Sequence, residues 1–302
     1  MVNIVAANAG HCLPLASVAA MSTEPTSTRR PKPVGQAPVF HARGITPETR
    51  IISVASGKGG VGKSTVAVNL AVSLAKSHTV GLLDADIYGF SIPSMMGVTS
   101  APEVCNQHDL DPPECHGVKV MSMGYFLDED RPLMWRGPML GKALRQMLTD
   151  VYWNGPEFLI IDTPPGTGDV AMTINELFVN AETLVVTTPG ASAQRVAIRS
   201  GSMAKETGGQ LIGIVENMVD ETELFGRGGA DAIARELGSQ VVGSVRLSKQ
   251  LRIDTDTGAP TSASNSDPDV AHDFALLAKV VQDCKPAKRL RTQLKINESI
   301  AK

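Results

Sequence analysis

The sequence predicts an α/β fold of three layers, in which a mostly parallel central sheet is covered by helices on both faces. Two observations favour it. Short apolar runs alternate with amphipathic stretches from residue 51 onward, which is typical of strands joined by crossover helices. The runs are apolar throughout rather than at every second position, as expected of strands that are buried on both faces. The ligand of such a sheet lies beyond the carboxyl ends of its strands.

The strands and helices expected from this pattern alternate along the chain. The strand candidates are the apolar runs Ile51–Ala55, Val80–Leu83, Val118–Met121, Phe158–Ile161, Leu184–Thr187, Leu211–Val215 and Val241–Val245. The helix candidates lie between and after these runs, at about Ser64–Lys76, Met139–Tyr152, Val170–Phe178, Gln194–Thr207, Gly229–Leu237 and Asp267–Asp283. Asp84, Asp162 and Asn217 each follow a predicted strand, so we expect them to meet at one edge of the sheet.

Composition narrows the class of protein. Of the 302 residues, 42% are apolar and 20% are charged, and the formal net charge is −3, so we expect no nucleic-acid partner. No apolar run reaches the roughly 18 residues that span a bilayer, so we expect no stable membrane insertion. The four cysteines lack a disulfide-like spacing, which favours a reducing compartment and a cytoplasmic location.

Three segments are expected along the chain. Residues 1–48 form an N-terminal arm, because residues 22–48 are rich in proline and show no helical or strand period, which is typical of disorder. The start of the chain lacks the basic residues of a targeting signal, and Met21 is a candidate for the true translation start. Residues 49–284 form the folded domain, and residues 285–302 form a basic tail without an assigned function.

The segment IISVASGKGGVGKST carries the clearest motif. It matches G-x-x-x-x-G-K-[ST] between a β-branched run and an apolar-periodic helix, the context in which this pattern is a phosphate-binding loop. The glycines let the backbone turn its N–H groups toward a polyphosphate. Lys63 neutralises the β- and γ-phosphates, and the Ser64 hydroxyl completes a Mg²⁺ shell. We therefore predict a P-loop NTPase that binds ATP through Gly57, Lys58, Gly59, Gly60, Val61, Gly62, Lys63, Ser64 and Thr65.

Three aspartates follow predicted strands near this loop. In LLDADIYG, Asp84 and Asp86 are separated by one residue, and we expect them to differ in role. We assign Asp86 to the attacking water, as a catalytic residue with Lys58 and Lys63, and Asp84 to a structural role or the outer metal shell. Asp162 ends the apolar run of FLIIDTPPGTGD and holds Mg²⁺ through water. The residues that follow it are expected to move when the γ-phosphate leaves.

Several long motifs together resemble one family. They are GKGGVGKST, LLDADIYGFSIPSMMG, WRGPM, IDTPPGTGD and GIVENM, and they resemble the Mrp-type ATPases, an iron–sulfur cluster carrier family among the MinD/ParA-like P-loop NTPases with a deviant Walker A loop. The resemblance covers about Arg50 to Val281 and implies a slow, partner-coupled hydrolysis of ATP to ADP and phosphate.

The resemblance also implies a homodimer that sandwiches ATP. In that group a lysine at the place of Lys58 reaches the phosphates of the partner subunit, whereas the alternative for this position is a solvated loop residue. Asn217 in the ENM motif matches the residue that reads the adenine edge in relatives, and its alternative role is to cap a loop. An amide, with a donor and an acceptor, suits either role.

Members of the family are described as carriers that hand a cluster to apo iron–sulfur client proteins. In relatives a C-x-x-C pair for the cluster lies between the ENM motif and an FG-G-GG segment, but this chain reads ENMVDETELFGRGG without a cysteine. A different group, Cys105, His108, Cys115 and His116, contains ligand types for zinc or a cluster. The alternative for this insertion is a variable loop, and Cys105 and Cys115 remain the candidate ligands.

Two functions therefore stay open. The first is an ATP-hydrolysing homodimeric iron–sulfur cluster carrier of the Mrp type, which the long motifs favour. The second is an ATP-switched regulatory or positioning ATPase of the MinD/ParA kind without a cluster, which the missing C-x-x-C pair favours.

Overall fold

A computed structural model describes residues 44–87, 89–105, 109–126, 137–166, 169–178, 181–220 and 225–286. Met21, His108, residues 1–43 of the predicted arm and residues 287–302 of the predicted tail lie outside these ranges. From Gly44 onward the chain already contacts the folded domain, because the Gly155 N–H donates to the Gly44 carbonyl at 2.7 Å.

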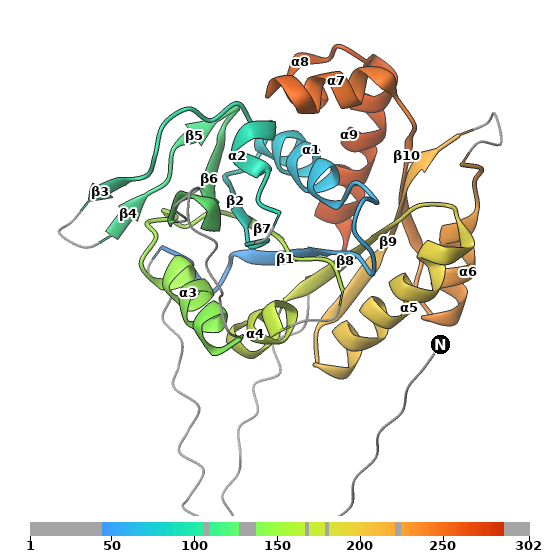
Figure 1. Cartoon of the computed structure of the whole chain (residues 1–302), viewed down its shortest axis with the longest axis horizontal. Coiled ribbons are helices and arrows are strands. Elements are labelled where there is room, and N and C mark those ends of the chain that lie inside the picture. Colours follow the sequence, from blue (N-terminus) through green and yellow to red (C-terminus); the bar gives the residue numbers. More distant parts are fainter. Residues whose placement is uncertain are drawn as a thin grey trace, which may run out of the picture. The chain divides into compact units, whose positions relative to one another are not determined.

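Most of the strands belong to one parallel sheet. The strands are β1 Arg50–Ala55, β2 Val80–Asp84, β3 Glu103–Cys105, β4 Asp109–Asp111, β5 Glu114–Cys115, β6 Val118–Ser122, β7 Phe158–Asp162, β8 Glu182–Thr187, β9 Gln210–Val219 and β10 Val241–Arg246. Within the described ranges, eight of them form a sheet in the order β10-β9-β8-β1-β7-β2-β6-β5 (Figure 1). Only its edge pair, β5 with β6, is antiparallel, and β3 pairs with β4 in a separate two-stranded sheet.

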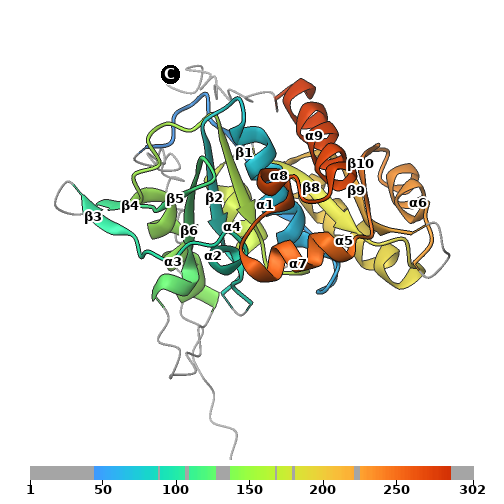
Figure 2. The same ribbon diagram turned by 90° about the horizontal axis from the view of Figure 1, so that it is seen from above.

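The helices connect the parallel strands. They are α1 Lys63–Ala75, α2 Ile92–Met95, α3 Gly137–Thr149, α4 Asp169–Leu177, α5 Ala191–Glu206, α6 Gly229–Glu236, α7 Lys249–Thr257, α8 Thr261–Ser264 and α9 Pro268–Asp283, with a 3₁₀ turn at Met123–Phe126. Figure 2 shows α7, α8 and α9 beside α1. In the part of the chain that the structure describes, none of these helices has the length and apolarity to cross a membrane.

Both faces of the sheet are covered, as the apolar runs predict. Ile52 and Leu82 point into a core shared with α1 and α9, whereas Ile51 and Leu83 point into a second core with α3 and α4. A third cluster joins β8 and β9 to α5 and α6. Because successive residues of a strand point to opposite faces, a strand between two helical layers must be apolar throughout. The predicted three-layer fold is confirmed.

The register of the central strands β1, β7 and β2 aligns their carboxyl ends at one edge of the sheet. Val54 of β1 and Asp84 of β2 are both Cα partners of Asp162 in β7. The three strands are parallel, so their carboxyl ends lie side by side, and the chain leaves each of them at the same edge. The segment after β1 and the carboxylates that end β2 and β7 are therefore neighbours.

Every predicted strand and helix has a counterpart in the structure, but some elements were not predicted. These are the strands of the insertion, β3, β4 and β5, and the short helices α2, α7 and α8. The prediction that Asn217 follows the end of a strand is wrong, because β9 continues to Val219. The apolar run ends at Val215, whereas the strand continues through the buried residues Glu216 and Asn217. Because these two residues are polar, the sequence pattern did not include them in the strand.

Candidate functional site

The predicted phosphate loop connects the buried strand β1 to helix α1. Gly60 and Gly62 adopt φ values of 81° and 80°, a left-handed conformation that glycine enters without a Cβ penalty. Helix α1 begins at Lys63, directly after Gly62. The first turn of a helix carries unpaired N–H groups and the positive end of the dipole, so the loop and the helix start together suit a polyphosphate.

Close packing explains why two residues of the loop, Gly57 and Gly62, are glycines. A Cβ at Gly57 would lie 2.1 Å from the backbone carbon of Val196 in α5, and a Cβ at Gly62 would lie 2.2 Å from Nδ2 of Asn217. By contrast, a Cβ at Gly59 or Gly60 would meet nothing within 4 Å. The loop therefore packs closely against the domain at Gly57 and Gly62. It is open at Gly59 and Gly60, where a ligand can approach its backbone.

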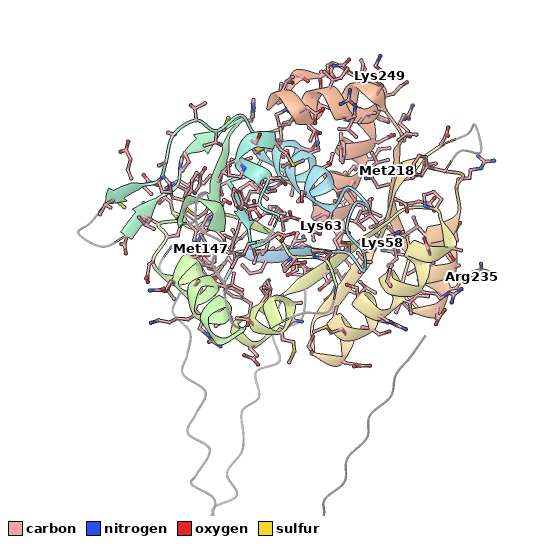
Figure 3. All side chains as sticks on the ribbon, in the orientation of Figure 1. Lys58, Lys63, Met147, Met218, Arg235 and Lys249 are labelled. Atoms are coloured by element: carbon pink, nitrogen blue, oxygen red, sulfur yellow. The ribbon has the colours of Figure 1, made fainter. Side chains whose placement is uncertain are left out.

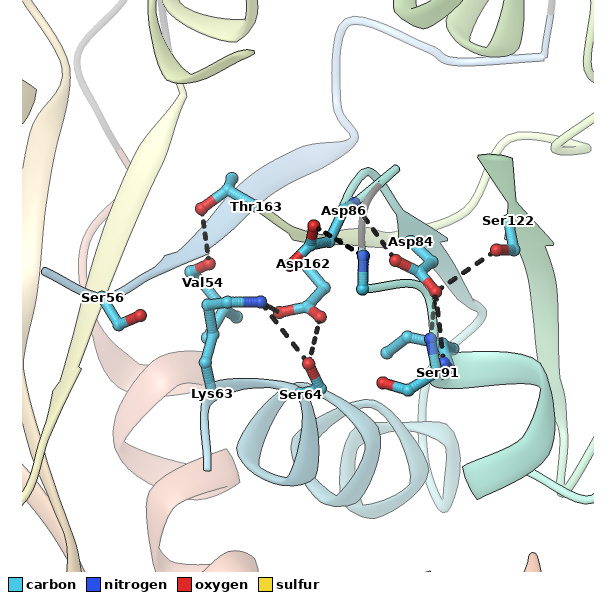
Figure 4. Close-up of polar contacts among 12 residues, drawn as sticks. Val54, Ser56, Lys63, Ser64, Asp84, Asp86, Ser91, Ser122, Asp162 and Thr163 are labelled. Atoms are coloured by element: carbon cyan, nitrogen blue, oxygen red, sulfur yellow. Dashed lines mark hydrogen bonds and ion pairs between the residues drawn. The ribbon is translucent and has the colours of Figure 1, made fainter. Parts of the chain in front are cut away.

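Lys63, Ser64 and Asp162 form the centre of the site (Figure 4). The Lys63 ammonium lies 2.5 Å from Oδ1 of Asp162, and the Ser64 hydroxyl donates to Oδ2 of the same carboxylate at 2.6 Å. Lys63 is 7% exposed and Asp162 is 1% exposed, so this ion pair is shielded from water. Burial raises the pKa of the Asp162 carboxyl, and the Lys63 ammonium opposes that effect. A buried carboxylate can remain ionised when a cation pairs with it, as the Lys63 ammonium pairs with Asp162 here.

Asp84 and Asp86 differ in their burial and in their hydrogen bonds. Asp84 is fully buried and accepts hydrogen bonds from the backbone N–H groups of Asp86, Ser91 and Ile92 at 3.2, 3.0 and 3.1 Å, and from the Ser122 hydroxyl at 3.2 Å. Burial raises its pKa to about 7. Asp84 therefore fixes the turn that carries Asp86, a structural role.

Asp86 lies at the phosphate loop. Its carboxylate is half-buried, accepts a hydrogen bond from the Gly89 N–H at 3.2 Å and lines the same cavity as Lys63. A half-buried carboxylate that is exposed to a cavity is free to orient water there, which its buried neighbour is not.

The loop after β7 closes one side of the site. The Thr163 hydroxyl donates to the Val54 carbonyl at 3.0 Å, and the Gly166 N–H donates to the Ser56 carbonyl at 2.7 Å. Thr167 and Gly168, the last residues of the loop that the sequence predicts to move, lie outside the described residues. These bonds attach the start of the loop to the strand that leads into the phosphate loop.

A cavity of about 300 Å³ opens at this place, and its lining includes Ser56, Lys58, Lys63, Asp86, Pro165 and Thr255. Lys58 is exposed, unlike Lys63, and Figure 3 shows the two lysines together where β1 passes into α1. Two cations of different exposure thus lie at one cavity, one of them accessible from outside the chain.

A second cavity of about 450 Å³ adjoins the first, and its lining includes Thr65, Asn217, Met218, Leu247, Leu251 and Thr255. Most of the exposed surface of this lining is apolar, and Arg246, Lys249 and Arg252 also border it. An apolar surface with the Asn217 amide at one side suits a flat heterocyclic base. The Asn217 side chain donates from Nδ2 to the Val61 carbonyl at 2.8 Å. Its amide therefore holds the phosphate loop and borders this second cavity.

Helix α7, which the sequence pattern did not predict, contributes to both cavities. Leu251 and Thr255 belong to this helix. A start signal was present, because Ser248 accepts a hydrogen bond from the Leu251 N–H at 3.2 Å as an N-cap and follows a predicted strand end. Serine directly before the first residue of a helix is a recognised start signal.

The oxygen donors of the site fit Mg²⁺. This ion prefers hydroxyl, carboxylate and water oxygens, and the Ser64 hydroxyl and Asp162 carboxylate lie 2.6 Å apart beside the phosphate loop. Asp86, which lines the same cavity, is close enough to raise the pKa of Asp162 electrostatically. A divalent cation would relieve this repulsion.

The candidate cysteine ligands lie on different strands. Cys105 is in β3 and pairs with Asp109, whereas Cys115 is in β5 and pairs with Val118. The Cys115 thiol donates to the Met96 carbonyl at 3.0 Å. Among the residues that the structure describes, no group of three or more histidine, cysteine or acidic side chains is arranged to hold a metal ion.

Comparison with known proteins identifies the family of this chain. The family model ParA, described as NUBPL iron-transfer P-loop NTPase, matches residues 48–282. The iron–sulfur cluster carrier protein of Bacillus subtilis (strain 168) is 46% identical over 226 residues, which are 72% of this chain and 64% of that protein. The protein of the same name from Mycobacterium tuberculosis (strain H37Rv) is 45% identical over 244 residues, 76% and 64% of the two chains. The chain thus spans less than two thirds of the length of these relatives.

Solved structures show the same fold. A nucleotide-binding protein in complex with ADP from Archaeoglobus fulgidus is 33% identical, with a TM-score of 0.61 over 75% of this chain and 93% of that chain. The septum site-determining protein MinD complexed with Mg-ADP from Pyrococcus horikoshii OT3 has a TM-score of 0.63 at 22% identity, over 78% and 96% of the two chains.

Proposed function

This chain belongs to the ParA family of NUBPL iron-transfer P-loop NTPases, and from this premise we propose that it binds and hydrolyses ATP as a homodimer that serves iron–sulfur cluster transfer. One observation carries the ATPase proposal. Lys63, Ser64 and Asp162 converge at the carboxyl end of a parallel sheet, beside Asp86 and an open phosphate loop. The two adjoining cavities offer room for the phosphates and for the base.

In this proposal each residue has a defined task. Asp86 orients the attacking water, whose oxygen forms a bond to the γ-phosphorus as the bond to the β-γ bridging oxygen breaks, giving ADP and phosphate. Lys63 leaves the Asp162 carboxylate for the phosphates, which its flexible stem permits, and neutralises charge there. The Ser64 hydroxyl and, through water, the Asp162 carboxylate would hold Mg²⁺, which supplies charge neutralisation at the phosphate oxygens.

The exposed position of Lys58 supports the proposed homodimer. Its side chain is exposed on the cavity that Lys63 and Asp86 line, so a second copy of the chain that covers this cavity would bring the two Lys58 side chains to the shared surface. A cation is stabilising where negative charge develops on phosphate oxygens. We assign Lys58 to the phosphates of the partner subunit.

Phosphate release tests the ATPase proposal. The wild-type chain should release phosphate from ATP in the presence of Mg²⁺ and stop when EDTA is added. Asp86→Asn should keep nucleotide binding, measured by calorimetry, and lose about 10²-fold or more in turnover. If the wild type binds no ATP, or if Asp86→Asn turns over normally, the assigned chemistry is wrong.

We propose iron–sulfur transfer because the relatives of this chain are iron–sulfur cluster carrier proteins. The cluster is the cargo, and its ligands differ from a C-x-x-C pair after the ENM motif, because residues 216–229 contain no cysteine. Cys105 and Cys115 are half-buried thiols in the insertion before β6, and thiolates are the usual cluster ligands. We propose these two cysteines as the ligands, with apo iron–sulfur proteins as the clients.

Anaerobic reconstitution tests the cargo. The wild type and a Cys105→Ala/Cys115→Ala variant are incubated with iron and sulfide, and visible absorption and bound iron are measured. Bound iron in the wild type and its loss in the double variant are expected. Cys284→Ala is the matched control, because Cys284 follows α9 at the other end of the domain. A wild type that binds no iron would contradict direct carriage.

A second function is favoured by the missing cysteine pair. An ATP-switched regulatory or positioning ATPase needs the nucleotide site and the dimer but no cluster. It predicts normal ATP hydrolysis by a chain that binds no iron, an outcome that the two experiments above distinguish from the carrier.

A further inference from the structure

The cavity beside the phosphate loop and the adjoining mostly apolar cavity share two lining residues, Thr65 and Thr255. Thr65 lies in the first turn of α1, and Thr255 lies in α7. The place where the two cavities meet is therefore lined by one threonine from the phosphate-loop helix and one from a helix near the end of the domain. In a nucleotide with its phosphates in the first cavity and its base in the second, the ribose lies at this junction.

The Thr255 hydroxyl already donates its proton in a hydrogen bond within the helix. It donates to the Leu251 carbonyl, one turn earlier in α7, at 2.7 Å. A threonine hydroxyl has one proton and two lone pairs, so Thr255 can offer only an acceptor to a group in the cavity. An ionised phosphate has no proton to donate, whereas each ribose hydroxyl has one. The chemistry of Thr255 therefore suits the sugar and does not suit the phosphates.

Helix α7 is held firmly enough to position such a contact. Asp254, the neighbour of Thr255, is 4% exposed and accepts hydrogen bonds from Gln250 Nε2 at 2.7 Å, from the Thr261 hydroxyl at 2.5 Å and from the Ser266 hydroxyl. A buried carboxylate with several donors stays in place because leaving any of them unpaired is costly. Asp254 thus fixes α7 against the residues that follow it.

The next helix connects α7 to the phosphate-loop helix. The Ser262 N–H in α8 donates to Oδ1 of Asn69 at 2.9 Å, and the Ser262 and Ser73 hydroxyls lie 3.0 Å apart. Asn69 and Ser73 both belong to α1. The position of Thr255 is therefore set relative to the same helix that carries Lys63 and Thr65.

We propose that Thr255 accepts a hydrogen bond from a ribose hydroxyl of the bound nucleotide and makes the site prefer a nucleotide that carries this hydroxyl over the analogue that lacks it. This inference rests on the proposed ATP site and adds a specificity-determining residue to it. It places α7 in direct contact with the ligand, beside the phosphate loop and Asn217.

Calorimetry with the full chain and Mg²⁺ tests the inference, with ADP, 2′-deoxy-ADP and 3′-deoxy-ADP as probes so that hydrolysis does not intervene. The wild type should bind ADP about 3- to 10-fold more tightly than the analogue that lacks the contacted hydroxyl, the value of one net hydrogen bond. Thr255→Val should bind ADP and both analogues equally. Thr255→Ser, which keeps the hydroxyl, should keep the preference.

Thr257→Val is the matched control. Thr257 is exposed in the same helix, and its hydroxyl makes the same type of bond, to the Ile253 carbonyl at 2.9 Å. It should behave as the wild type. A wild type that binds ADP without any preference, or a preference that survives in Thr255→Val, would overturn the role of Thr255. Absence of any nucleotide binding to the wild type would instead overturn the proposed function and this inference with it.

Discussion

At the scale of single residues, Asp162 connects the parts of the candidate site. Its carboxylate contacts the Lys63 ammonium and the Ser64 hydroxyl, and its backbone carbonyl accepts a hydrogen bond from the Ala85 N–H at 2.9 Å. The last of these bonds ties the end of β7 to the segment that leads to Asp86. One residue therefore sets the relative positions of the phosphate-loop lysine, the hydroxyl that suits Mg²⁺ and the carboxylate assigned to water.

Lys58→Ala should lower ATP turnover by about 10²-fold or more, because a cation at the developing charge of the phosphates is removed. Binding of ATP should change less than turnover, since Lys63 remains. Lys76→Ala is the control, because Lys76 is an exposed lysine at the other end of α1. Steady-state phosphate release by the two variants decides the matter. Near-normal turnover in Lys58→Ala would refute the catalytic role.

Asp84 should make stability depend on pH. Burial raises its pKa to about 7, so the folded protein holds a proton that the unfolded chain, with an ordinary carboxyl near pH 4, has already lost. Its contribution to stability is therefore present below about pH 4 and is lost as the pH rises toward about 7, with a slope of at most about 1.4 kcal/mol per pH unit. Urea unfolding of the wild type and Asp84→Asn between about pH 5 and about pH 8 measures it.

The quantity to compare is the difference in unfolding free energy between the wild type and Asp84→Asn. The wild type should lose unfolding free energy relative to Asp84→Asn as the pH rises, and the titration of groups that do not interact with Asp84 cancels in the difference. A difference that is constant with pH would show that Asp84 has an ordinary pKa.

At the scale of elements, the sequence pattern predicted the central strands and long helices because a strand between two helical layers is apolar along its whole length. It could not predict β3, β4 and β5, which are two or three residues long and lack a continuous apolar run. It also missed α7, whose sequence KQLRIDTDT has few apolar residues. This helix is held by the side-chain bonds of Asp254, which join residues that no local period reveals.

The same distinction applies to the site. The phosphate loop and Asp86 follow strand ends, and Asp162 is the last residue of β7. All of them belong to contiguous motifs, so their proximity follows from the parallel sheet. The second cavity does not follow in this way, because Met218, Leu247 and Leu251 come from separate elements. Only the folded chain brings them to one place.

Glu216 should hold the start of α6. Its buried carboxylate accepts hydrogen bonds from the N–H groups of Gly228 and Ala230, both at 2.9 Å. Glu216→Ala leaves these donors without their acceptor and should cost about 1–3 kcal/mol of unfolding free energy, measured with urea. Glu216→Gln keeps one oxygen acceptor and should cost less. Glu206→Ala, at an exposed position that ends α5, is the control. Equal stabilities would contradict this role.

At the scale of the whole molecule, the three layers bring the residues of the proposed nucleotide site to one edge of the sheet. Because the exposed Lys58 lies beside the buried Lys63, we propose that two copies of the chain complete each other's ATP site. In a symmetric dimer every site then takes its phosphate loop and Asp86 from one subunit and Lys58 from the other.

Mixing two inactive variants tests this claim most directly. Lys58→Ala keeps its own Asp86, and Asp86→Asn keeps the Lys58 that it gives to its partner, so a mixed dimer contains one complete site. Equal amounts of the two should release phosphate from ATP at about a quarter of the wild-type rate, since half of the dimers are mixed and each has one working site. A mixture as inactive as its two components, with an active wild type, would contradict completion of the site by the partner.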